Sequence, residues 1–500
     1  ALGETFIVYD PAFQKLELLG AETTMADGRK VPAPANAFNE VLPFAAHGCA
    51  DFSGLREMVV THTGLERGAV VDLKYRIHTA PGFLPVFCGS EPLRRDFPVD
   101  RYELAIEVPA GVDLAYEIRG AAGATMLETA EPQGGKRHVL RFSGLPPVAH
   151  DLLAPPQSEP FIVFSASREW QRALELPAGP AVLPAALRER IARLKTALAA
   201  PADLLAALQR IVAGEIGGGA LDAATIGWRA RPLERVVQGN YATRLEKALL
   251  LQAMLKEAGI EAELLAVAAG SEFAPGVATP LQMGDFLLKV GDGADPIFVD
   301  PSREQGGFFP YAAQGLSAWN LSRGALEALP ASDWQRNGVD VSGTAQLGAD
   351  GVSGTLTVWA RGSFQRYDEA AADPAGFLSG LLRKFFPLDK AEVKKLLALT
   401  RDEIRAEVAF SGKWLKELGG GLLAAEPPRL PWLVDAMVIQ EQRQAALALE
   451  APFQASLRLE IEPAAGLKLE MAAAALERRN ALGFLTRGLG AGPDGRLHLA

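Results

Sequence analysis

The sequence contains few of the residues that carry out nucleophilic and metal chemistry. Only two cysteines, Cys49 and Cys88, occur among its 500 residues. This count excludes a disulfide-rich scaffold and a four-thiolate zinc site. All six histidines lie outside the stretch 151–497, which also lacks cysteine. A reaction that needs an imidazole base or a thiol nucleophile therefore cannot be built from that stretch alone.

Excess positive charge and long apolar runs are also absent. Lys and Arg together number 50 against 60 Asp and Glu, which gives a net charge of -10. This balance disfavours nucleic acid as the main partner and docking on an anionic membrane surface, since both need a basic field. No apolar run reaches the roughly 18 residues that a membrane span requires. The 49% hydrophobic content is typical of a folded protein, and the length predicts about three domains.

The first part, residues 1–155, has the pattern of a β-sandwich. Short segments that alternate apolar and polar residues are separated by turn signals such as Pro81-Gly82 and Gly134-Gly135. Strands are predicted at residues 5–9, 14–22, 57–62, 69–76 and 102–108. A proline-rich stretch at 145–156 is typical of a linker and predicts the end of this domain.

The second part, residues 156–335, has an α+β pattern. Helical spacing predicts helices at 184–198 and 202–216, and a third helix from Arg244 to Ala258. Thr243 and Glu246 form a capping-box signature at the start of that helix, and Gly259 is a good left-handed stop. Apolar residues occupy most of its circumference, which predicts that it is buried. Strands are predicted to follow at 262–267, 286–290 and 297–299.

The third part, residues 336–500, is predicted to be β-rich. Two strand-like segments flank Ala349-Asp350-Gly351, which is a strong hairpin signal. A helical insert is predicted at about 368–398, and further strands at 404–410, 444–449 and 455–461. The predicted fold class is therefore multidomain α+β, with β-rich domains on either side of a mixed central domain.

The order of several motifs resembles a known family. The run Glu246-Lys247-Ala248-Leu249-Leu250-Leu251 is followed by Ala258-Gly259-Ile260 and then by Phe298-Val299-Asp300-Pro301-Ser302. This order, between two β-rich regions, resembles bacterial secreted proteins with a transglutaminase-like (papain-like) domain flanked by β-rich domains of unknown function. The resemblance implies a bacterial cell-envelope protein, periplasmic or secreted. It also implies family material ahead of Ala1, so we expect the first domain to be truncated at its N-terminus.

The resemblance also implies where a catalytic triad would lie. Active members of that family use Cys, His and Asp, with the Cys at the start of the buried helix. Counting back from Lys247-Ala248, the Cys position falls on Arg244, and the His position falls on Asp285, with Gly284 as the less favoured register. Only Asp300 matches the family pattern. If Gly239-Asn240-Tyr241 is matched instead, the Cys position falls on Tyr241. We therefore interpret the central domain as a degenerate, non-catalytic transglutaminase fold.

Two interpretations of these positions remain open. Arg244, Asp285 and Asp300 could form a ligand site in which Arg244 binds a carboxylate or an amide-rich peptide, with Tyr241 and Asn240 as candidate contacts. The same three residues could instead form a structural ion pair that replaces thiolate and imidazolium with charges reversed. Because a cation in the first helical turn opposes the helix dipole, Arg244 is expected to have a carboxylate partner.

Other sites are weaker on sequence alone. Asp292, Asp295, Asp300 and Glu304 do not have the spacing of a calcium loop, and turn chemistry accounts for the first two. His47, Cys49 and His62 match no standard metal pattern. Neither a metal nor a cofactor is predicted. Cys49 and Cys88 could pair in an oxidising compartment, or each could be a buried small hydrophobe. The tryptophans Trp228, Trp319 and Trp414 are expected in cores or domain contacts.

The favoured function is a non-catalytic protein that binds or scaffolds a peptide or protein partner. The alternative is a cryptic amidase, peptidase or transamidase whose catalytic residues come from outside the usual positions. That alternative predicts His150, His47 or Cys49 within hydrogen-bonding distance of Asp300. A purely structural module without a ligand is a third option.

Overall fold

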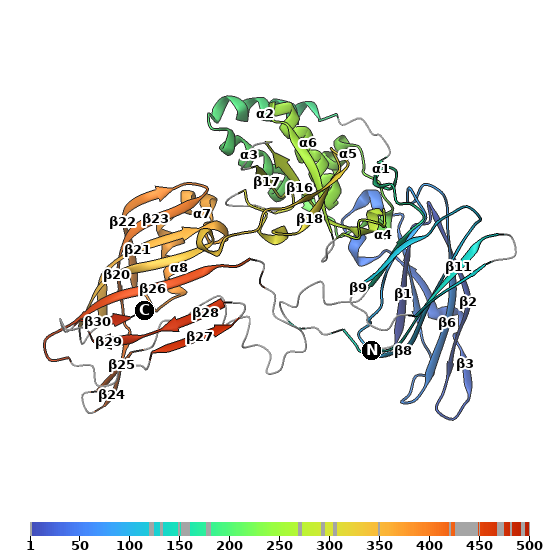
Figure 1. Cartoon of the computed structure of the whole chain (residues 1–500), viewed down its shortest axis with the longest axis horizontal. Helices are drawn as coiled ribbons and strands as arrows, with labels where there is room; N and C mark the ends of the chain where they lie inside the picture. Colours follow the sequence, from blue (N-terminus) through green and yellow to red (C-terminus); the bar gives the residue numbers. More distant parts are fainter. Residues whose placement is uncertain are drawn as a thin grey trace. The chain divides into compact units, whose positions relative to one another are not determined.

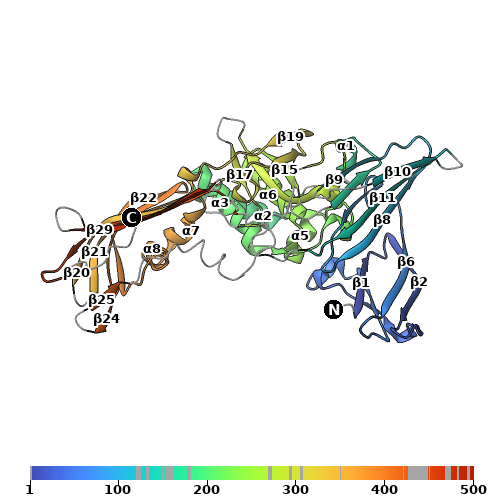
Figure 2. The same cartoon turned by 60° about the horizontal axis from the view of Figure 1, so that its bottom comes forward.

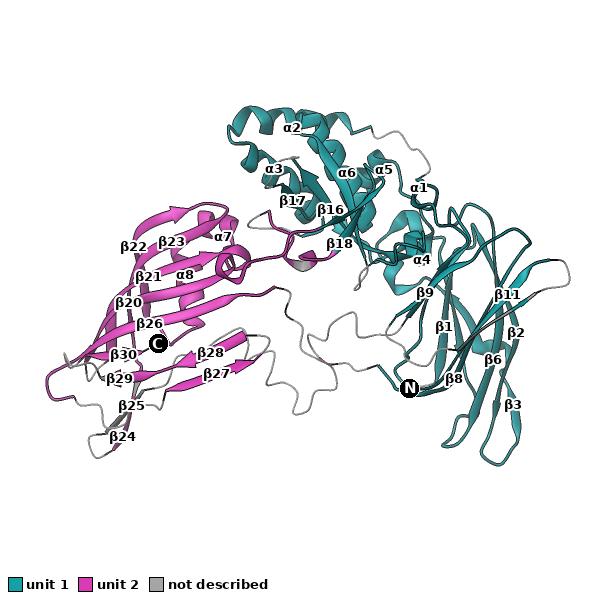
Figure 3. Cartoon of the chain, in the orientation of Figure 1, with its two compact units in different colours: residues 1–149, 156–304, 317–328 teal, residues 150–155, 305–316, 329–500 magenta. Residues whose placement is uncertain are grey.

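The computed structural model divides the chain into two compact units (Figures 1 and 3). One unit comprises residues 1–149, 156–304 and 317–328, and the other comprises residues 150–155, 305–316 and 329–500. The chain is therefore multidomain and rich in β-sheet, as predicted. The structure describes residues 3–119, 125–130, 134–148, 151, 161–176, 182–268, 273–291, 296–303, 308–348, 351–419, 422–425, 449, 451–467, 475–480, 483–491 and 496–499.

The first domain is built from four three-stranded antiparallel sheets. Their strand orders, with bounds, are β1 (Glu4–Tyr9), β5 (Arg56–Thr61), β4 (Phe38–Val41); β3 (Lys30–Pro32), β2 (Gln14–Thr24), β6 (Val70–Thr79); β10 (Thr125–Ala130), β11 (Lys136–Leu145), β8 (Val99–Val108); and β7 (Cys88–Pro92), β12 (Phe161–Ser165), β9 (Ala115–Arg119). The five strands predicted in this region are all present. β12 follows the predicted linker yet pairs with β7 and β9, so the first domain extends past residue 155.

Alternation along these strands gives the first domain an apolar interior. Its buried cluster combines residues from β8, β11 and β12 with neighbouring loops: Leu93, Ile106, Val108, Leu114, Leu140, Phe142, Ile162 and Phe164. Successive side chains of a strand point to opposite faces, so alternate residues of β8, β11 and β12 supply this core, while Val163 faces a second apolar cluster with Ala115, Ala274 and Val277.

The central domain places helices against a five-stranded sheet. The sheet order is β17 (Ile297–Val299), β16 (Met283–Val290), β15 (Ala262–Ala268), β18 (Ser317–Asn320), β19 (Ala325–Ala328). The helices are α1 (Trp170–Ala173), α2 (Ala185–Ala197), α3 (Pro201–Arg210), α4 (Ala223–Ile226), α5 (Leu233–Gly239) and α6 (Arg244–Ala258). A short parallel pair, β13 (Gly217–Gly218) and β14 (Tyr241–Ala242), lies just before α6.

Helix α6 is the centre of this domain. It packs against β15 and β16 on one side and against α2, α3 and α5 on the other (Figures 1 and 2). The predicted capping box is present, because Thr243 accepts from the Glu246 amide and Glu246 accepts from the Thr243 amide. Gly259 ends the helix at φ 82° in the left-handed region. The predicted bounds and burial of this helix are confirmed.

The helix predicted at 202–216 has the predicted extent, but its last residues form a π-helix rather than an α-helix. Helix α3 ends at Arg210, and residues Ile211–Glu215 continue as a π-helix, η5. Apolar spacing does not distinguish a π-turn from an α-turn over so few residues, since both bury one face.

The first and central domains meet at a tightly packed loop. Gly227 has φ 78°, and a Cβ there would lie 2.3 Å from the carbonyl oxygen of Phe83. The next amide, of Trp228, donates to that same carbonyl at 2.9 Å. Glycine is therefore required at 227 by both the positive φ and the close approach of the first domain.

The second unit contains one large sheet with two helices. The strand order is β22 (Lys390–Leu399), β23 (Glu403–Gly412), β21 (Gly351–Arg361), β20 (Gly338–Gly348), β26 (Gln454–Pro463), β30 (Leu497–Leu499), β29 (Leu489–Ala491). β20 and β21 form the predicted hairpin. Two further hairpins are β24 (Leu415–Gly419) with β25 (Leu422–Ala425) and β27 (Leu476–Asn480) with β28 (Gly483–Arg487). The strand predicted at 444–449 lies outside the described residues apart from Leu449.

The predicted helical insert at 368–398 was only half right. Helices α7 (Tyr367–Ala372) and α8 (Pro374–Arg383) are present, but residues Lys390–Leu399 form strand β22 beside β23. Pro387 interrupts the helical pattern, and the later residues gain a ladder partner that sequence spacing does not reveal. Helix α8 packs its apolar face on the sheet, where Leu378 and Leu382 join the core, and Phe385 follows just after the helix.

Seven short 3₁₀-helices complete the described elements. They are η1 (Ala35–Ala37), η2 (Phe44–Ala46), η3 (Ala50–Phe52), η6 (Pro280–Gln282), η7 (Tyr311–Ala313), η8 (Trp334–Arg336) and η9 (Gly362–Phe364). Among the described helices, none is both long and apolar enough to cross a membrane.

Candidate functional site

Arg244 and Asp285 form an ion pair at the start of α6. The guanidinium Nη1 lies 2.9 Å from Asp285 Oδ1 and also donates to the carbonyl oxygen of Gly284 at 2.8 Å. The Arg244 and Asp285 side chains are 59% and 50% exposed. The structure thus brings together two of the three predicted positions. A pair this exposed contributes only about 0–1 kcal/mol to stability, since water screens it.

Asp300 is the buried member of the group. It directly follows β17, and its Oδ1 accepts from the Ser302 amide at 2.8 Å. Gln209 holds the same turn through its carboxamide, which donates to the main-chain carbonyls of Asp300 and Arg303. Burial raises the pKa of Asp300; the Ser302 amide and the charge of Arg303 oppose this shift, and the charge of Asp285 adds to it. The charge of Asp285 therefore acts on Asp300 as well as on Arg244, while Asp300 forms an ion pair with Arg303 at 3.8 Å.

Lys247 is a site residue that sequence reasoning missed. It lies three residues after Arg244 on α6, yet it is only 4% exposed. Its Nζ donates to the Ala213 carbonyl of the π-helix at 3.4 Å, a long contact. Burial lowers the pKa of Lys247, while the charge of Asp300 opposes that shift. The available signal was a lysine inside an otherwise apolar helix circumference, because buried lysines are rare without a partner.

The two candidate ligand contacts, Tyr241 and Asn240, have structural surroundings. The Tyr241 side chain is buried, and its hydroxyl accepts from the Asp51 amide at 2.7 Å. Asn240 caps α5 in the left-handed region at φ 53°, and its carbonyl accepts from the Gly217 amide. Asparagine tolerates this conformation better than most residues. We therefore do not carry these two residues into the site at Arg244.

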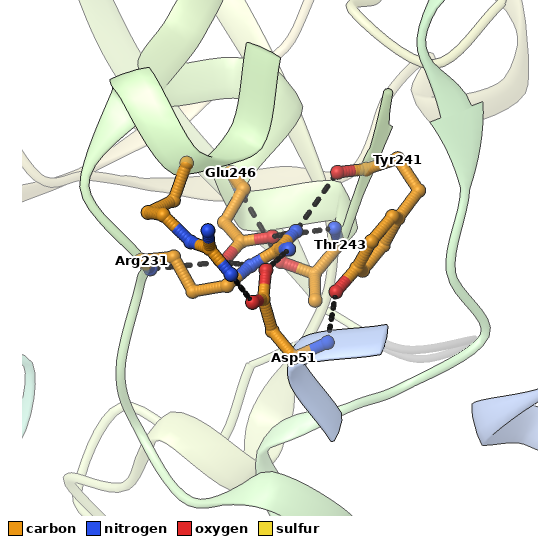
Figure 4. Close-up of polar contacts among 6 residues, drawn as sticks. Asp51, Arg231, Tyr241, Thr243 and Glu246 are labelled. Carbon is orange, nitrogen blue, oxygen red and sulfur yellow. Dashed lines mark hydrogen bonds and ion pairs between the residues drawn. The ribbon is translucent and has the colours of Figure 1, made fainter. Parts of the chain in front are cut away.

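A charged cluster lies just behind the start of α6 (Figure 4). Arg231 donates to Glu246 through Nε at 2.9 Å and Nη2 at 2.8 Å, and to Asp51 through Nη1 at 2.6 Å. Nη2 also donates to the Tyr241 carbonyl at 2.8 Å, and the guanidinium lies 4.1 Å from the Tyr241 ring centroid. We call Asp51, Arg231, Tyr241 and Glu246 the Arg231 cluster. Asp51 is the member that comes from the first domain.

The Arg231 cluster is held by strong local electrostatics. Burial alone would raise the pKa of Asp51, but hydrogen bonds from Arg231 and Arg235 hold that pKa down at about 2. Burial alone would lower the pKa of Arg231, but its hydrogen bonds to Glu246 and Asp51 leave it raised. Both groups therefore stay charged at neutral pH.

The shift at Asp51 predicts a loss of stability in acid. A carboxyl whose pKa is about 2 when folded and 3.8 when unfolded stabilises the fold above pH 4, and that contribution is lost as the pH falls toward 2. At 1.36 kcal/mol per pKa unit, the full term is about 2 kcal/mol. We expect the difference in unfolding free energy between the native chain and Asp51→Asn to shrink by roughly 1.5 kcal/mol from pH 5 to pH 2.5. Urea titrations at both pH values measure it, and a pH-independent difference would contradict it.

Cys49 and His47, the described first-domain residues proposed to complete a triad, do not have the surroundings of a catalytic group. Cys49 packs in an apolar cluster with Phe52, Leu221 and Tyr241, and burial raises its pKa. A buried neutral thiol is a poor nucleophile. His47 is exposed beside Phe44. Cys49 and His47 are therefore not seen beside Asp300, and His150 lies outside the described residues.

The remaining candidates from the sequence fall into structural roles. Cys49 and Cys88 are both free, and burial raises the pKa of Cys88 to about 11. His62 hydrogen-bonds Thr5 at 2.8 Å. Asp292, Asp295 and Glu304 lie outside the described residues; within the described part of the chain, no three His, Cys, Asp or Glu gather around a metal position. Trp228 and Trp414 are buried, and Trp319 stacks on Trp170 at 4.7 Å, as expected for core residues.

The chemistry at the start of α6 is that of charge pairing. Two cations, Arg244 and Lys247, lie near two carboxylates, Asp285 and Asp300. Such a set can donate and accept hydrogen bonds with a polar ligand. Neither a thiol nor an imidazole occupies the positions where the family resemblance implies them.

The chain is similar to several known proteins. Residues 1–149 match the model of a family described as a domain of unknown function, DUF3857. A comparison with curated proteins gave no match. Two solved structures overlap weakly: a "putative cysteine protease" from Cytophaga hutchinsonii (11% identity, TM-score 0.19, 43% of this chain and 75% of that one) and the periplasmic domain of TgpA from Pseudomonas aeruginosa (13%, 0.18, 45% and 84%).

One solved structure matches almost the whole chain. It is a "putative protease" from Parabacteroides distasonis, 22% identical, with a TM-score of 0.67 over 99% of this chain and 84% of that chain. The present chain therefore shares its fold with that protein across nearly its full length, and its first domain matches DUF3857.

Proposed function

We propose that this chain is a non-catalytic transglutaminase-like protein that binds an extended peptide segment of a partner at the start of α6. The observation that carries the proposal is the Arg244–Asp285 ion pair, at 2.9 Å, at the two positions where the resemblance implies Cys and His. The pair has the reversed charges that such a replacement requires. A cell-envelope location rests on the resemblance alone.

The ion pair has capacity left for a ligand. Among the described residues, both contacts of the Arg244 guanidinium use Nη1, so Nε and Nη2 can donate elsewhere. The Asp285 contact uses Oδ1, which leaves Oδ2 as an acceptor. A peptide group offers one carbonyl and one amide, and these match a guanidinium donor and a carboxylate acceptor side by side. An extended peptide backbone is therefore the ligand class that this pair supports best.

The proposal is tested by selection and turnover on the purified full chain. We expect dodecapeptides selected from a random phage-displayed library on the native protein to lose at least about tenfold in affinity for Arg244→Ala/Asp285→Ala, since hydrogen bonds to charged groups contribute about 1.5–3 kcal/mol each. Arg193→Ala, at an exposed arginine on α2, is the matched control and should bind like the native chain.

The same proteins are assayed for hydrolysis of labelled casein and for amine incorporation into casein. We expect no turnover from any of them. Turnover by the native chain that disappears in Arg244→Ala/Asp285→Ala would favour the alternative, a cryptic amidase, peptidase or transamidase. Equal peptide affinity in the native and double-variant proteins would refute binding at this pair.

A further inference from the structure

The Arg231 cluster connects the first domain to the residue pair at the start of α6. Glu246 joins the two, because its carboxylate accepts hydrogen bonds from both the helix cap and Arg231. It accepts from the Thr243 amide at 2.9 Å to close the capping box, and it accepts from Arg231 through both oxygens. The first turn of α6 therefore has its cap held in place by Arg231.

Arg231 is in turn oriented by the first domain. Its Nη1 donates to Asp51 on η3, and its guanidinium also lies 5.0 Å from the ring centroid of Phe52. Four of the five guanidinium N–H groups are engaged by Asp51, Glu246 and the Tyr241 carbonyl. A planar fork with this many fixed partners has little freedom to turn, so displacing Asp51 changes the position of Glu246.

A second contact reaches the same segment. The Asp51 amide donates to the Tyr241 hydroxyl, two residues before the helix cap at Thr243. Arg235 also hydrogen-bonds Asp51 and fixes its other carboxylate oxygen. Asp51 thus contacts both Arg231 and Tyr241, which lie at the two ends of the segment that leads into α6. Arg244 is the first residue of the helix that follows.

We propose that Asp51 is a positioning residue through which the first domain sets the first turn of α6 and thereby the Arg244–Asp285 pair. This inference extends the proposed function. Only its effect on peptide affinity rests on that function; its effect on the helix cap does not. It implies that the β-rich first domain is a required part of the ligand site rather than an independent module.

Simple adhesion between the domains is the competing explanation, and the chain contains a matched control for it. Asp10 of the first domain pairs with Arg229 of the central domain at 2.6 Å, and the Asp10 side chain is 6% exposed, against 17% for Asp51. Its described contacts involve the Asp10–Gln14 turn and Arg229. Asp10→Asn should therefore weaken the same domain contact without disturbing the helix cap.

The experiment is amide hydrogen exchange of the full chain, read by mass spectrometry on fragments covering Tyr241–Leu250. We expect Asp51→Asn to raise the exchange rate of the Thr243, Glu246 and Lys247 amides by at least about tenfold, because these amides lie in or directly after the capping box. Asp10→Asn should leave them within twofold of the native rate. Arg231→Lys keeps the charge but not the fork and should behave like Asp51→Asn.

Affinity for a selected dodecapeptide, measured on the same variants, tests the link to Arg244. The proposal is supported if Asp51→Asn shows both faster exchange at the helix cap and lower peptide affinity, and Asp10→Asn shows neither change. Equal effects of the two variants would overturn it in favour of simple adhesion. A local rise in exchange with unchanged affinity would overturn the connection between Asp51 and the ligand pair. The exchange result stands even if no dodecapeptide binds the native chain, so a failed function and a failed positioning role remain distinguishable.

Discussion

Replacing Arg231 with methionine is expected to lower the free energy of unfolding of the first unit by about 3–5 kcal/mol. The substitution leaves the Glu246 carboxylate without its cation, while Asp51 keeps only Arg235. Glu246 is 1% exposed, so water cannot replace the contacts that it loses. Removing one partner of a buried pair is costly because the other charge stays buried and uncompensated. Methionine keeps much of the volume, so the effect is mainly electrostatic.

Urea denaturation followed by tryptophan fluorescence measures this change. Arg168→Met is the control, because Arg168 pairs with Asp113 at 3.3 Å in an exposed ion pair, and it should shift stability by no more than about 0.5 kcal/mol. Arg231→Met/Glu246→Gln should recover part of the loss, since it removes the buried negative charge. A stability of Arg231→Met within 1 kcal/mol of the native value would show that the cluster contributes little net stabilisation.

The double substitution Arg244→Cys/Asp285→His is expected to create a reactive thiol at the start of α6. The native side chains meet at 2.9 Å, and the variant tests whether the shorter Cys and His side chains at these positions meet as well. A helix N-terminus and an adjacent imidazolium both stabilise thiolate, and Asp300 is the carboxylate expected to orient the imidazole. If the thiol pKa falls from about 8.5 to about 7, the thiolate fraction at pH 6 rises roughly 30-fold.

Alkylation by iodoacetamide at pH 6, followed by peptide mass spectrometry, measures the thiol at position 244. The single variant Arg244→Cys is the control, because Asp285 then faces the thiol and disfavours its ionised form. Cys49 and Cys88 should react slowly, since burial raises the pKa of both. Equal alkylation rates in the single and double variants would mean that residues 244 and 285 do not have the geometry of a thiol–imidazole pair.

Local sequence signals determined the elements that position the site. The capping box, the apolar circumference and the stop at Gly259 correctly bounded α6, because each depends on residues within one or two helical turns. The motif order that follows α6 led to Arg244, Asp285 and Asp300. The prediction that Arg244 needs a carboxylate partner followed from the helix dipole, and Asp285 is the carboxylate that lies beside it.

Other features were decided only by contacts between distant segments. The strand at Lys390–Leu399 exists because β23 supplies a ladder partner, and β12 joins the first domain by pairing across the linker. Lys247 is buried where α6 packs against the π-helix, and its own sequence neighbourhood does not indicate that contact. Asp51 and Arg231 are 180 residues apart, and nothing in either local sequence pairs them.

The sequence by itself therefore determined the β-rich multidomain composition, the buried helix and the absence of Cys and His from the central stretch. Each of these is a property of composition or of residues close along the chain. The tertiary structure decided which charges meet. The energy of an ion pair depends on distance and on exclusion of water, and both are set only when the first domain, α6 and the sheet pack together.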